Sequence, residues 1–426
     1  MLTRRAVLGG AAALISRGAN PPEYAPISTV VSIGSREVRT DSPPRGLVLR
    51  RDLGLLTAEA VNGQLVHQAK DRLFETRATI TPAGDYLLMF PDGQHYGGKP
   101  GKVNAMLAYR SSDRGKTWKG PYEPFHIDYS QHGFIPLISR RGKRIYAFGT
   151  QPIEGMREDR ENCPIGFRWS DDDGRTWSEV QLIRPVNNPT FLGMSVMRMC
   201  ETPRGTWLLG SHEGDWTKKP LRTRQYLLRS EDRGKTWTVL PGASPNGWYV
   251  KQYDRMDERP IPIGGDNVFL MMRTAEGHLW GAWSSDDGRT WTDPKPTPLV
   301  HPDAPPMLFP LPDGKTLAAF HHNRYSDRNY TGLDGRKPEV MKDRSELWVS
   351  LSRDGGHTWT EPRLLLVNAF AETETLPFYN YQCSYLDAFH DGGTMHLFLP
   401  HRWKRALHLT IRAADLERLP LTSQIS

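Results

Sequence analysis

The sequence predicts an all-β protein folded as a six-bladed β-propeller. Three observations support this prediction: five copies of one turn motif, an extended segment in front of each copy, and a composition rich in turn-forming residues. The chain contains 39 Gly, 34 Pro and 13 Trp among its 426 residues, which is typical of many short strands joined by turns. With 38% hydrophobic and 24% charged residues, the chain is expected to fold as a globular protein.

The turn motif has the pattern Ser-x-Asp-x-Gly-x-Thr-Trp. It occurs at residues 111–118, 170–177, 230–237, 284–291 and 352–359. The Asp carboxylate can accept backbone N–H bonds across a tight turn, and the Gly allows a positive φ. The Trp can bury a large ring against its own sheet. We call this motif the Asp-box turn and expect it to be structural, at the outside of the ring and without a catalytic role.

Extended segments precede the Asp-box turns. Those directly before a turn include residues 105–110, 278–283 and 346–351, and further strands are predicted upstream at 86–90, 206–210 and 268–272. Each unit is therefore a small antiparallel sheet of about four strands, the size of a propeller blade.

A sixth blade without an Asp-box turn is predicted after the last copy. Its strands would be residues 385–389, 394–399 and 406–411, and the segment 46–56 would add the closing strand from the N-terminal end. Closing the ring in this way removes exposed sheet edges. We therefore expect a single domain over residues 20–426.

The first 19 residues are predicted to be an export signal. Arg4 and Arg5 precede the short apolar run 6–15, a pattern that resembles a twin-arginine signal and predicts a periplasmic or secreted protein. This run is too short to span a bilayer, and no longer apolar stretch follows it, so no membrane span is predicted.

Charge and cysteine usage exclude several classes of function. The net charge of +7 is spread along the chain without a basic run, so no nucleic-acid partner is predicted. Cys163, Cys200 and Cys383 are odd in number and far apart, which gives neither a disulfide framework nor paired metal ligands. No motif predicts a metal or another cofactor, and the oligomeric state is not predicted.

The Asp-box turns and the strands between them resemble the sialidase (neuraminidase) family over nearly the whole mature chain. The resemblance implies a sialidase-like propeller that hydrolyses a terminal acidic sugar. It also implies three arginines that bind the substrate carboxylate, a tyrosine nucleophile activated by a glutamate, and an aspartate acid/base. A guanidinium fork matches a carboxylate with two parallel hydrogen bonds, and it stays charged in any environment.

Three arginines match the family positions. Arg344 opens the strand before the last Asp-box turn, and Arg273 follows the strand at 268–272. Arg77 lies in the segment 74–80, where the family has an aromatic-Arg-Ile-Pro motif, with Arg72 as the alternative.

Glu258 matches the family glutamate. It begins a predicted inner strand, and Arg273 ends the next strand, so both are expected at equivalent heights of neighbouring strands. Competitors for these roles stand just before Glu258, at Asp254, Arg255 and Asp257.

The nucleophile position departs from the family pattern. Direct alignment places Cys383 where the family has its tyrosine, within Tyr381-Gln-Cys-Ser-Tyr385. Residues 381, 383 and 385 would share one face of a strand, so Tyr381 or Tyr385 could also reach the site. Cys383 is alternatively a small buried hydrophobic residue.

The acid/base position departs as well. The family aspartate falls at Lys99, in the loop 91–100, and Asp92 or His95 of the same loop could replace it. Asp92 is equally well explained as part of a plain Asp-Gly turn.

Four histidines are further candidates for general acid/base chemistry: His132, His212, His321 and His322. With tyrosine and arginine, such a residue would suit β-elimination at a uronic acid.

The leading hypothesis is therefore an exported, sialidase-like glycoside hydrolase whose partner is a glycan with a carboxylate. The alternatives are a glycosidase or polysaccharide lyase for another acidic sugar, and a non-catalytic carbohydrate-binding propeller.

Overall fold

The computed structural model describes residues 26–69, 73, 75–91, 104–127, 135–138, 142–150, 162–193, 195–215, 217, 222–240, 258–274, 277–302, 304–324, 344–371 and 383–425. Within these ranges the regular structure consists of β-strands and two short 3₁₀ segments, η3 (Ala413–Arg418) and η4 (Thr422–Gln424). The predicted export signal lies outside the described residues.

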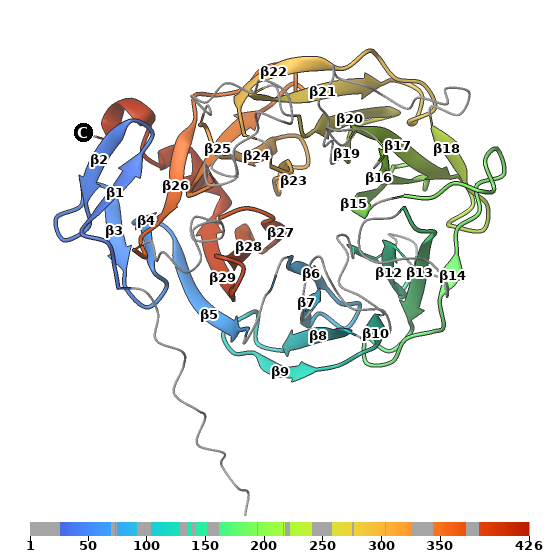
Figure 1. Cartoon of the computed structure of the whole chain (residues 1–426), viewed down its shortest axis with the longest axis horizontal. Coiled ribbons are helices and arrows are strands. Elements are labelled where there is room, and N and C mark those ends of the chain that lie inside the picture. The colour runs from blue at the N-terminus through green and yellow to red at the C-terminus, as the bar shows by residue number, and fades with distance from the viewer. Residues whose placement is uncertain are drawn as a thin grey trace, which may run out of the picture.

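Six antiparallel sheets stand around a ring, which confirms the predicted six-bladed β-propeller (Figure 1). Blade 1 contains β6 (Arg77–Ile80), β7 (Tyr86–Pro91), β8 (Asn104–Ser111), β9 (Lys119–Tyr122) and β10 (His126–Ile127). Blade 2 contains β11 (Ile135–Ile138), β12 (Ile145–Thr150), β13 (Ile165–Ser170) and β14 (Gln181–Leu182). Blade 3 contains β15 (Ser195–Glu201), β16 (Trp207–Asp215), β17 (Arg222–Ser230) and β18 (Thr238–Leu240).

The other three blades complete the ring. Blade 4 contains β19 (Glu258–Gly264), β20 (Asn267–Met272), β21 (His278–Ser284) and β22 (Lys295–Val300). Blade 5 contains β23 (Met307–Pro310), β24 (Leu317–His321), β25 (Glu346–Ser352) and β26 (Arg363–Asn368). Blade 6 contains β27 (Asp387–Asp391), β28 (Thr394–His401), β29 (Arg405–Arg412) and β5 (Asn62–Gln68). The first strands of the blades are the innermost, and each contacts the next until β27 meets β6.

The closing strand is not the one predicted from the sequence. Residues 62–68 form β5, which pairs with β29 and so joins the N-terminal part of the chain to blade 6. The predicted segment 46–56 instead contributes β3 (Leu47–Arg50) and the start of β4 (Leu55–Ala58), which extend blade 5 beyond β26. Burial explains the difference, because every residue of β4 is buried whereas β5 has the exposed positions of an outermost strand. Outside this sheet, β1 (Val30–Ile33) and β2 (Arg36–Arg39) form a hairpin of their own.

The core lies between the blades. The middle strands are buried on both faces, as in β7, β24 and β25, because each sheet is covered by the sheets on either side. This is why these segments are almost continuously apolar in sequence. The largest apolar cluster joins blades 5 and 6 and includes Phe309, Phe320 and Leu397.

The Asp-box turns have the predicted structural role. In the first copy, Asp113 accepts bonds from the hydroxyl of Ser111 at 2.7 Å and from the backbone N–H and hydroxyl of Thr117 at 2.9 and 2.6 Å. Gly115 has a φ of 80° and donates its N–H to the Ser111 hydroxyl at 2.8 Å. The other four copies repeat the bonds from Ser and Thr to the Asp. The motif therefore closes the turn after the third strand in blades 1 to 5.

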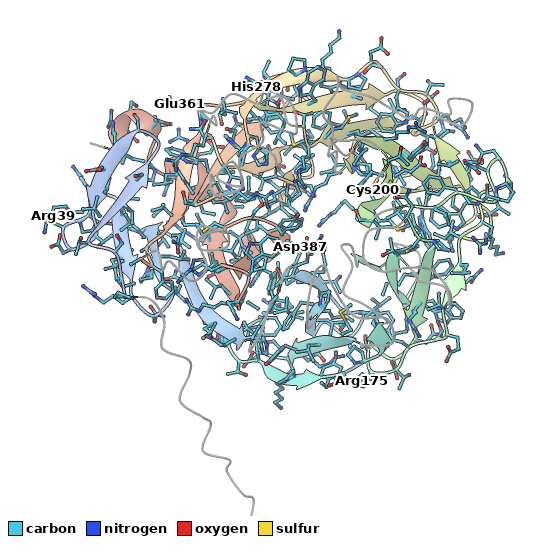
Figure 2. All side chains as sticks on the ribbon, viewed as in Figure 1. Arg39, Arg175, Cys200, His278, Glu361 and Asp387 are labelled. Atoms are coloured by element: carbon cyan, nitrogen blue, oxygen red, sulfur yellow. The ribbon has the colours of Figure 1, made fainter. Side chains whose placement is uncertain are left out.

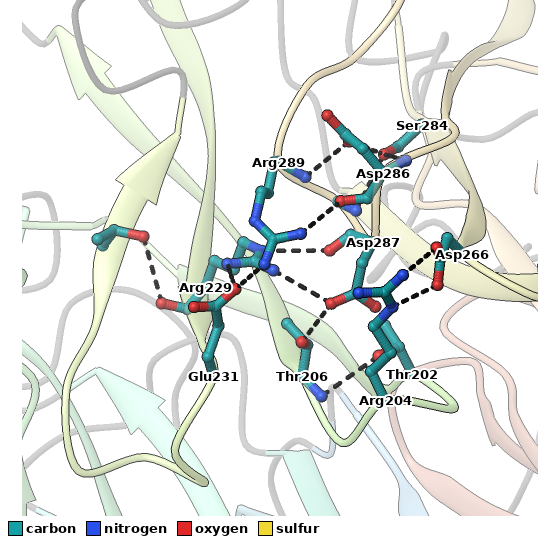
Figure 3. Close-up of polar contacts among 12 residues, drawn as sticks. Thr202, Arg204, Thr206, Arg229, Glu231, Asp266, Ser284, Asp286, Asp287 and Arg289 are labelled. Atoms are coloured by element: carbon teal, nitrogen blue, oxygen red, sulfur yellow. Dashed lines mark hydrogen bonds and ion pairs between the residues drawn. The ribbon is translucent and has the colours of Figure 1, made fainter.

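Several Asp-box turns also bind the preceding blade. Arg110 of blade 1 donates to the backbone oxygen of Asp173 at 2.5 Å, and Arg229 of blade 3 donates to the carboxylate of Asp287 at 3.1 Å. Figure 3 shows how Glu231 enlarges this second contact into an ionic network between blades 3 and 4. The motif thus contributes to blade association as well as to turn formation.

Each blade has two edges, which differ in the strand ends and turns that they carry. We call one of them the upper edge. Because neighbouring strands are antiparallel, the upper edge contains the start of the first strand, the end of the second strand and the start of the third strand. The Asp-box turn follows the third strand and therefore lies at the other edge, which we call the Asp-box edge.

Candidate functional site

The three predicted arginines are all at the upper edge. Arg77 begins the first strand of blade 1, Arg273 follows the second strand of blade 4, and Arg344 precedes the third strand of blade 5. Their exposed fractions are 2%, 3% and 0%, so none of them points outward into solvent. Their convergence on one anion stays a prediction.

Arg77 lies beside an acidic partner. Its Nη2 donates to the carboxylate of Glu75 at 3.0 Å, and its Nη1 donates to the backbone oxygen of Thr76 at the same distance. Both side chains of the ion pair are almost fully buried, so the charge of the guanidinium is balanced inside the protein. The carboxylate also fixes the direction of the guanidinium fork.

Arg344 meets the predicted nucleophile segment. Its guanidinium carbon lies 5.7 Å from the centre of the Tyr385 ring, and its backbone oxygen accepts the N–H of Cys383 at 2.8 Å. The Tyr385 ring also contacts Trp403, with 5.4 Å between ring centres. The structure therefore brings Arg344, Cys383 and Tyr385 together, and their roles at a carboxylate site and as nucleophile stay predictions.

The predicted strand at 385–389 begins later than expected. β27 starts at Asp387, and Tyr385 has a φ of 62°, which is rare for a bulky residue. The expectation that residues 383 and 385 share one face of a strand is therefore wrong, and Tyr381 lies outside the described residues. The Tyr385 ring contacts both Arg344 and Trp403.

Cys383 has the environment of a core residue. It is 0% exposed and belongs to the apolar cluster of blades 5 and 6. Burial raises the pKa of its thiol far above the ordinary value, so almost no thiolate forms at neutral pH. This favours the interpretation of Cys383 as a small hydrophobic residue over that of a nucleophile.

Glu258 and Arg273 are brought close together by the pairing of neighbouring strands. Glu258 begins β19 and pairs with Met272, which directly precedes Arg273. The predicted placement at equivalent heights of neighbouring strands therefore matches the backbone register.

The other candidates cannot be placed. Tyr381, Asp92 and His95 lie outside the described residues, as do Lys99 and the alternatives Arg72, His132, Asp254, Arg255 and Asp257.

A group of residues that was not predicted from the sequence lies where the inner strands meet. Arg198 of β15 donates to the carboxylate of Asp387 in β27, and the other oxygen of Asp387 accepts the N–H of Ala78 at 2.9 Å. The ring of Phe309 in β23 contacts two guanidinium groups. Its centre lies 4.8 Å from the guanidinium carbon of Arg198 and 5.5 Å from the guanidinium carbon of Arg259. We call Arg198, Arg259, Phe309 and Asp387 the central cluster. The signal in the sequence that could have indicated this cluster is weak. It is that each member lies on the first strand of a blade.

Three of the four candidate histidines, His212, His321 and His322, lie within the described residues and make contacts inside the fold. His212 lies within β16, which runs on beyond the strand predicted at 206–210, and contacts the Ser195 hydroxyl at 3.3 Å. His321 contacts the backbone oxygen of Val300 and the hydroxyl of Ser350, and His322 contacts the backbone oxygen of Glu346. Burial lowers the pKa of His321 to about 4 and that of His322 to about 3. Both are therefore neutral at ordinary pH.

No group of three or more His, Cys, Asp or Glu side chains is arranged to hold a metal ion in the part of the chain that the structure describes. Among the same residues, no helix is long and apolar enough to cross a membrane.

Comparison with known proteins identifies the family of this chain. A family model described as a BNR repeat-like domain matches residues 135–397. A sialidase from Bacteroides fragilis (strain YCH46) is 23% identical over 289 residues, which cover 61% of this chain and 48% of that protein. A xyloglucanase from a Paenibacillus species is 23% identical over 277 residues, which cover 59% of this chain and 23% of that protein. The matched part is thus less than half the length of either relative.

Solved structures share the propeller at low sequence identity. The NanB sialidase from Streptococcus pneumoniae has a TM-score of 0.58 at 12% identity, over 83% of this chain and 71% of that chain. The intramolecular trans-sialidase from Ruminococcus gnavus has a TM-score of 0.54 at 13% identity, over 83% and 98%. A protein of unknown function from Dyadobacter fermentans DSM 18053 has a TM-score of 0.59 at 15% identity, over 83% and 99%. These likenesses show the fold.

Proposed function

Because the chain belongs to the BNR repeat-like domain family, within the sialidase superfamily, we propose that it is an exported glycoside hydrolase that removes a terminal acidic sugar, such as sialic acid, from glycans. The observation that carries this proposal is the burial of Arg77, Arg273 and Arg344 at the upper edges of three different blades. Sialidases among the similar proteins support the same class of substrate.

Electrostatics favours an anionic substrate at this edge. A sugar carboxylate would supply two acceptor oxygens in the geometry that the guanidinium fork matches. The net charge of +7 would also attract an acidic glycan as it approaches.

The proposed chemistry uses a tyrosine nucleophile. Tyr381 or Tyr385 would attack the anomeric carbon after Glu258 accepts the phenol proton, while Asp92 or His95 would protonate the leaving oxygen. A phenol suits sialic acid, because the carboxylate on its anomeric carbon would repel an ionised Asp or Glu. The buried thiol of Cys383 leaves the tyrosines as the better candidates.

A second candidate is a glycosidase or lyase that acts on another acidic sugar. The observation that favours it is the departure from the family pattern at two positions, Cys383 in place of the tyrosine and Lys99 in place of the aspartate. The similarity to a xyloglucanase also extends the possible substrates beyond sialosides. The third candidate is a non-catalytic propeller in which the same arginines would bind a glycan without catalysis.

The test is turnover of a fluorogenic sialoside by the purified chain and by the variant Arg344→Lys. We expect release of free sialic acid by the wild type and a loss of about tenfold or more in kcat/KM in the variant, since one charge-assisted bidentate pair is replaced by a point charge. Arg229→Lys is the matched control, because Arg229 is also buried and ion-paired but lies in the network at the Asp-box edge. Its kcat/KM should remain near the wild-type value.

Other outcomes separate the candidates. Growth of an unsaturated-uronate absorbance on acidic polysaccharides, without sialoside turnover, would identify a lyase. Glycan binding without turnover of any substrate would identify a binding protein. Fusion of residues 1–19 to a folded reporter tests export, which we expect to depend on Arg4 and Arg5.

A further inference from the structure

A groove lies between blades 4 and 5 at the Asp-box edge. It has a volume of about 760 Å³, and its lining includes Asn267, Trp283, Lys315, Arg353 and His357. Trp283 and Arg353 stand at the ends of third strands, whereas Arg344 precedes the start of one. The groove is therefore at the edge opposite to the proposed active site.

The floor of this groove is a fixed pair of aromatic rings. The Trp283 and His357 rings are stacked, with centres 4.7 Å apart and planes 6° apart. The indole N–H of Trp283 donates to the backbone oxygen of Gly355 at 2.9 Å, and its ring packs against Phe269. His357 is exposed, so its outer face is open to solvent. Such a flat, preorganised surface can pack against the apolar C–H face of a sugar ring at little cost in conformational entropy.

Positive charge and hydrogen-bonding groups border the rings. Lys315 is exposed at the tip of the turn between β23 and β24, and the only lining acid, Asp354, already accepts the Thr358 hydroxyl at 2.6 Å. Arg353 also lines the groove and is ion-paired with Glu417 outside it. Exposed side chains that can bond sugar hydroxyls are those of Asn267, Ser285 and Thr292. Cations next to neutral polar groups suit a sugar that carries a carboxylate.

A second groove with a tryptophan lies two blades earlier, between blades 2 and 3. It has a volume of about 560 Å³, and its lining includes Trp169, Arg233 and Lys235 together with the acids Glu231 and Asp232. Trp169 and Trp283 both directly precede the Ser of an Asp-box turn. In blade 3 this position is Arg229, and its ion pairs with Glu231 and Asp287 span the boundary to blade 4 (Figure 3). A tryptophan at this position of the repeat is thus associated with an aromatic groove in both cases.

We propose that the two grooves are accessory binding sites for a carboxylate-bearing oligosaccharide, separate from the proposed active site. The rings bind the face of a sugar, and the cations bind its carboxylate. Two similar grooves on one edge bind a polymeric glycan more tightly than either does alone, provided that the chain spans both.

The experiment measures binding of the full chain to immobilised polygalacturonate and to the same polymer with its carboxylates methyl-esterified. We expect Lys315→Glu and His357→Ala each to weaken binding to polygalacturonate by about tenfold, the effect of losing one charge-assisted contact or one ring surface. Lys116→Glu is the matched control. Lys116 stands at the position of the first Asp-box turn that corresponds to His357, and its substitution by Glu changes the net charge by the same amount as Lys315→Glu. All three substituted side chains are exposed, and thermal unfolding checks that each variant is folded.

The control variant should bind like the wild type, and the esterified polymer should bind at least about tenfold more weakly. An equal loss in Lys116→Glu would mean general charge attraction and would overturn the proposal, as would equal binding of both polymers or no binding at all. Turnover of a small fluorogenic substrate should be unchanged in the groove variants. If the chain turns over no substrate yet shows this binding pattern, the proposed hydrolase function fails and the accessory sites stand.

Discussion

Arg198 donates a hydrogen bond to the carboxylate of Asp387 and so joins blade 3 to blade 6, its opposite in the ring. Figure 2 shows Asp387 near the middle of the ring and Arg175 at its rim. The Asp387 side chain is 3% exposed and that of Arg198 is 24% exposed. Since Asp387 also accepts the N–H of Ala78, this one carboxylate links three blades at the centre.

We therefore expect Asp387→Asn to lower the free energy of unfolding by about 2–3 kcal/mol. The variant leaves the Arg198 guanidinium without its anionic partner, and the partial exposure of Arg198 keeps the loss below that of a fully buried pair. Denaturant unfolding measures the change. Asp41→Asn is the control: its partner Arg39 is exposed, so no measurable change is expected. A double-mutant cycle with Arg198→Met should show coupling between the two residues, and strict additivity would contradict the account.

The Asp-box turns should affect stability and not chemistry. Asp172→Ala removes the acceptor of bonds from Ser170 and Thr176, and we expect it to lower the free energy of unfolding by about 1 kcal/mol. The kcat/KM of the folded variant should equal that of the wild type. Burial raises the pKa of the Asp172 carboxyl, but the hydrogen bonds from Thr176 and Ser170 outweigh burial and lower that pKa to about 2. A fall in kcat/KM without a loss of stability would contradict the structural role.

Buried histidines should make the fold sensitive to mild acid. Burial lowers the pKa of His321 to about 4 and the pKa values of His322 and His408 to about 3. In the unfolded chain these rings take up protons below about pH 6.5, whereas in the folded chain they do not. The unfolded state then binds more protons, so the free energy of unfolding falls as the pH drops from about 6.5 towards 4, by up to about 1.4 kcal/mol per pH unit for each such histidine.

Urea unfolding across this pH range measures the effect. His321→Gln should reduce the slope of stability against pH, because it removes one of the groups that titrate only in the unfolded chain. An unchanged slope would contradict the assignment of His321 as a neutral buried residue.

The nucleophile can be assigned by conservative substitution. Cys383→Ser should keep most of the turnover, since the Cys383 thiol is buried and its raised pKa makes it unreactive. Tyr381→Phe and Tyr385→Phe each remove only a phenolic oxygen, and we expect one of them to lower kcat by about a thousandfold or more. Loss of turnover in Cys383→Ser alone, in a folded protein, would reverse the assignment.

The blades were predictable because their signal is local. The Asp-box turn contains its own donors and acceptors within eight residues, so each copy specifies a turn without reference to the rest of the chain. The placement of Arg344 and Arg273 next to strand ends was predictable from the family resemblance, whereas their binding of a carboxylate stays a prediction. The closing strand was not, because two neighbouring N-terminal segments compete for it and burial between sheets decides the outcome.

The central cluster could not be predicted for a different reason. Arg198 and Asp387 are 189 residues apart, and only closure of the whole ring brings them together. The positive φ at Tyr385 was equally hidden, because the alternating pattern around it is typical of a strand.

The most direct test of the central claim compares a substrate that carries a free carboxylate with its uncharged methyl ester. It measures kcat/KM for a fluorogenic sialoside and for its carboxylate methyl ester, with the wild type and with Arg344→Lys. The account predicts that the wild type prefers the free acid by at least about tenfold and that the variant loses most of this preference. Equal turnover of acid and ester by the wild type, or an unchanged preference in the variant, would contradict the claim that Arg344 binds the carboxylate of an acidic sugar.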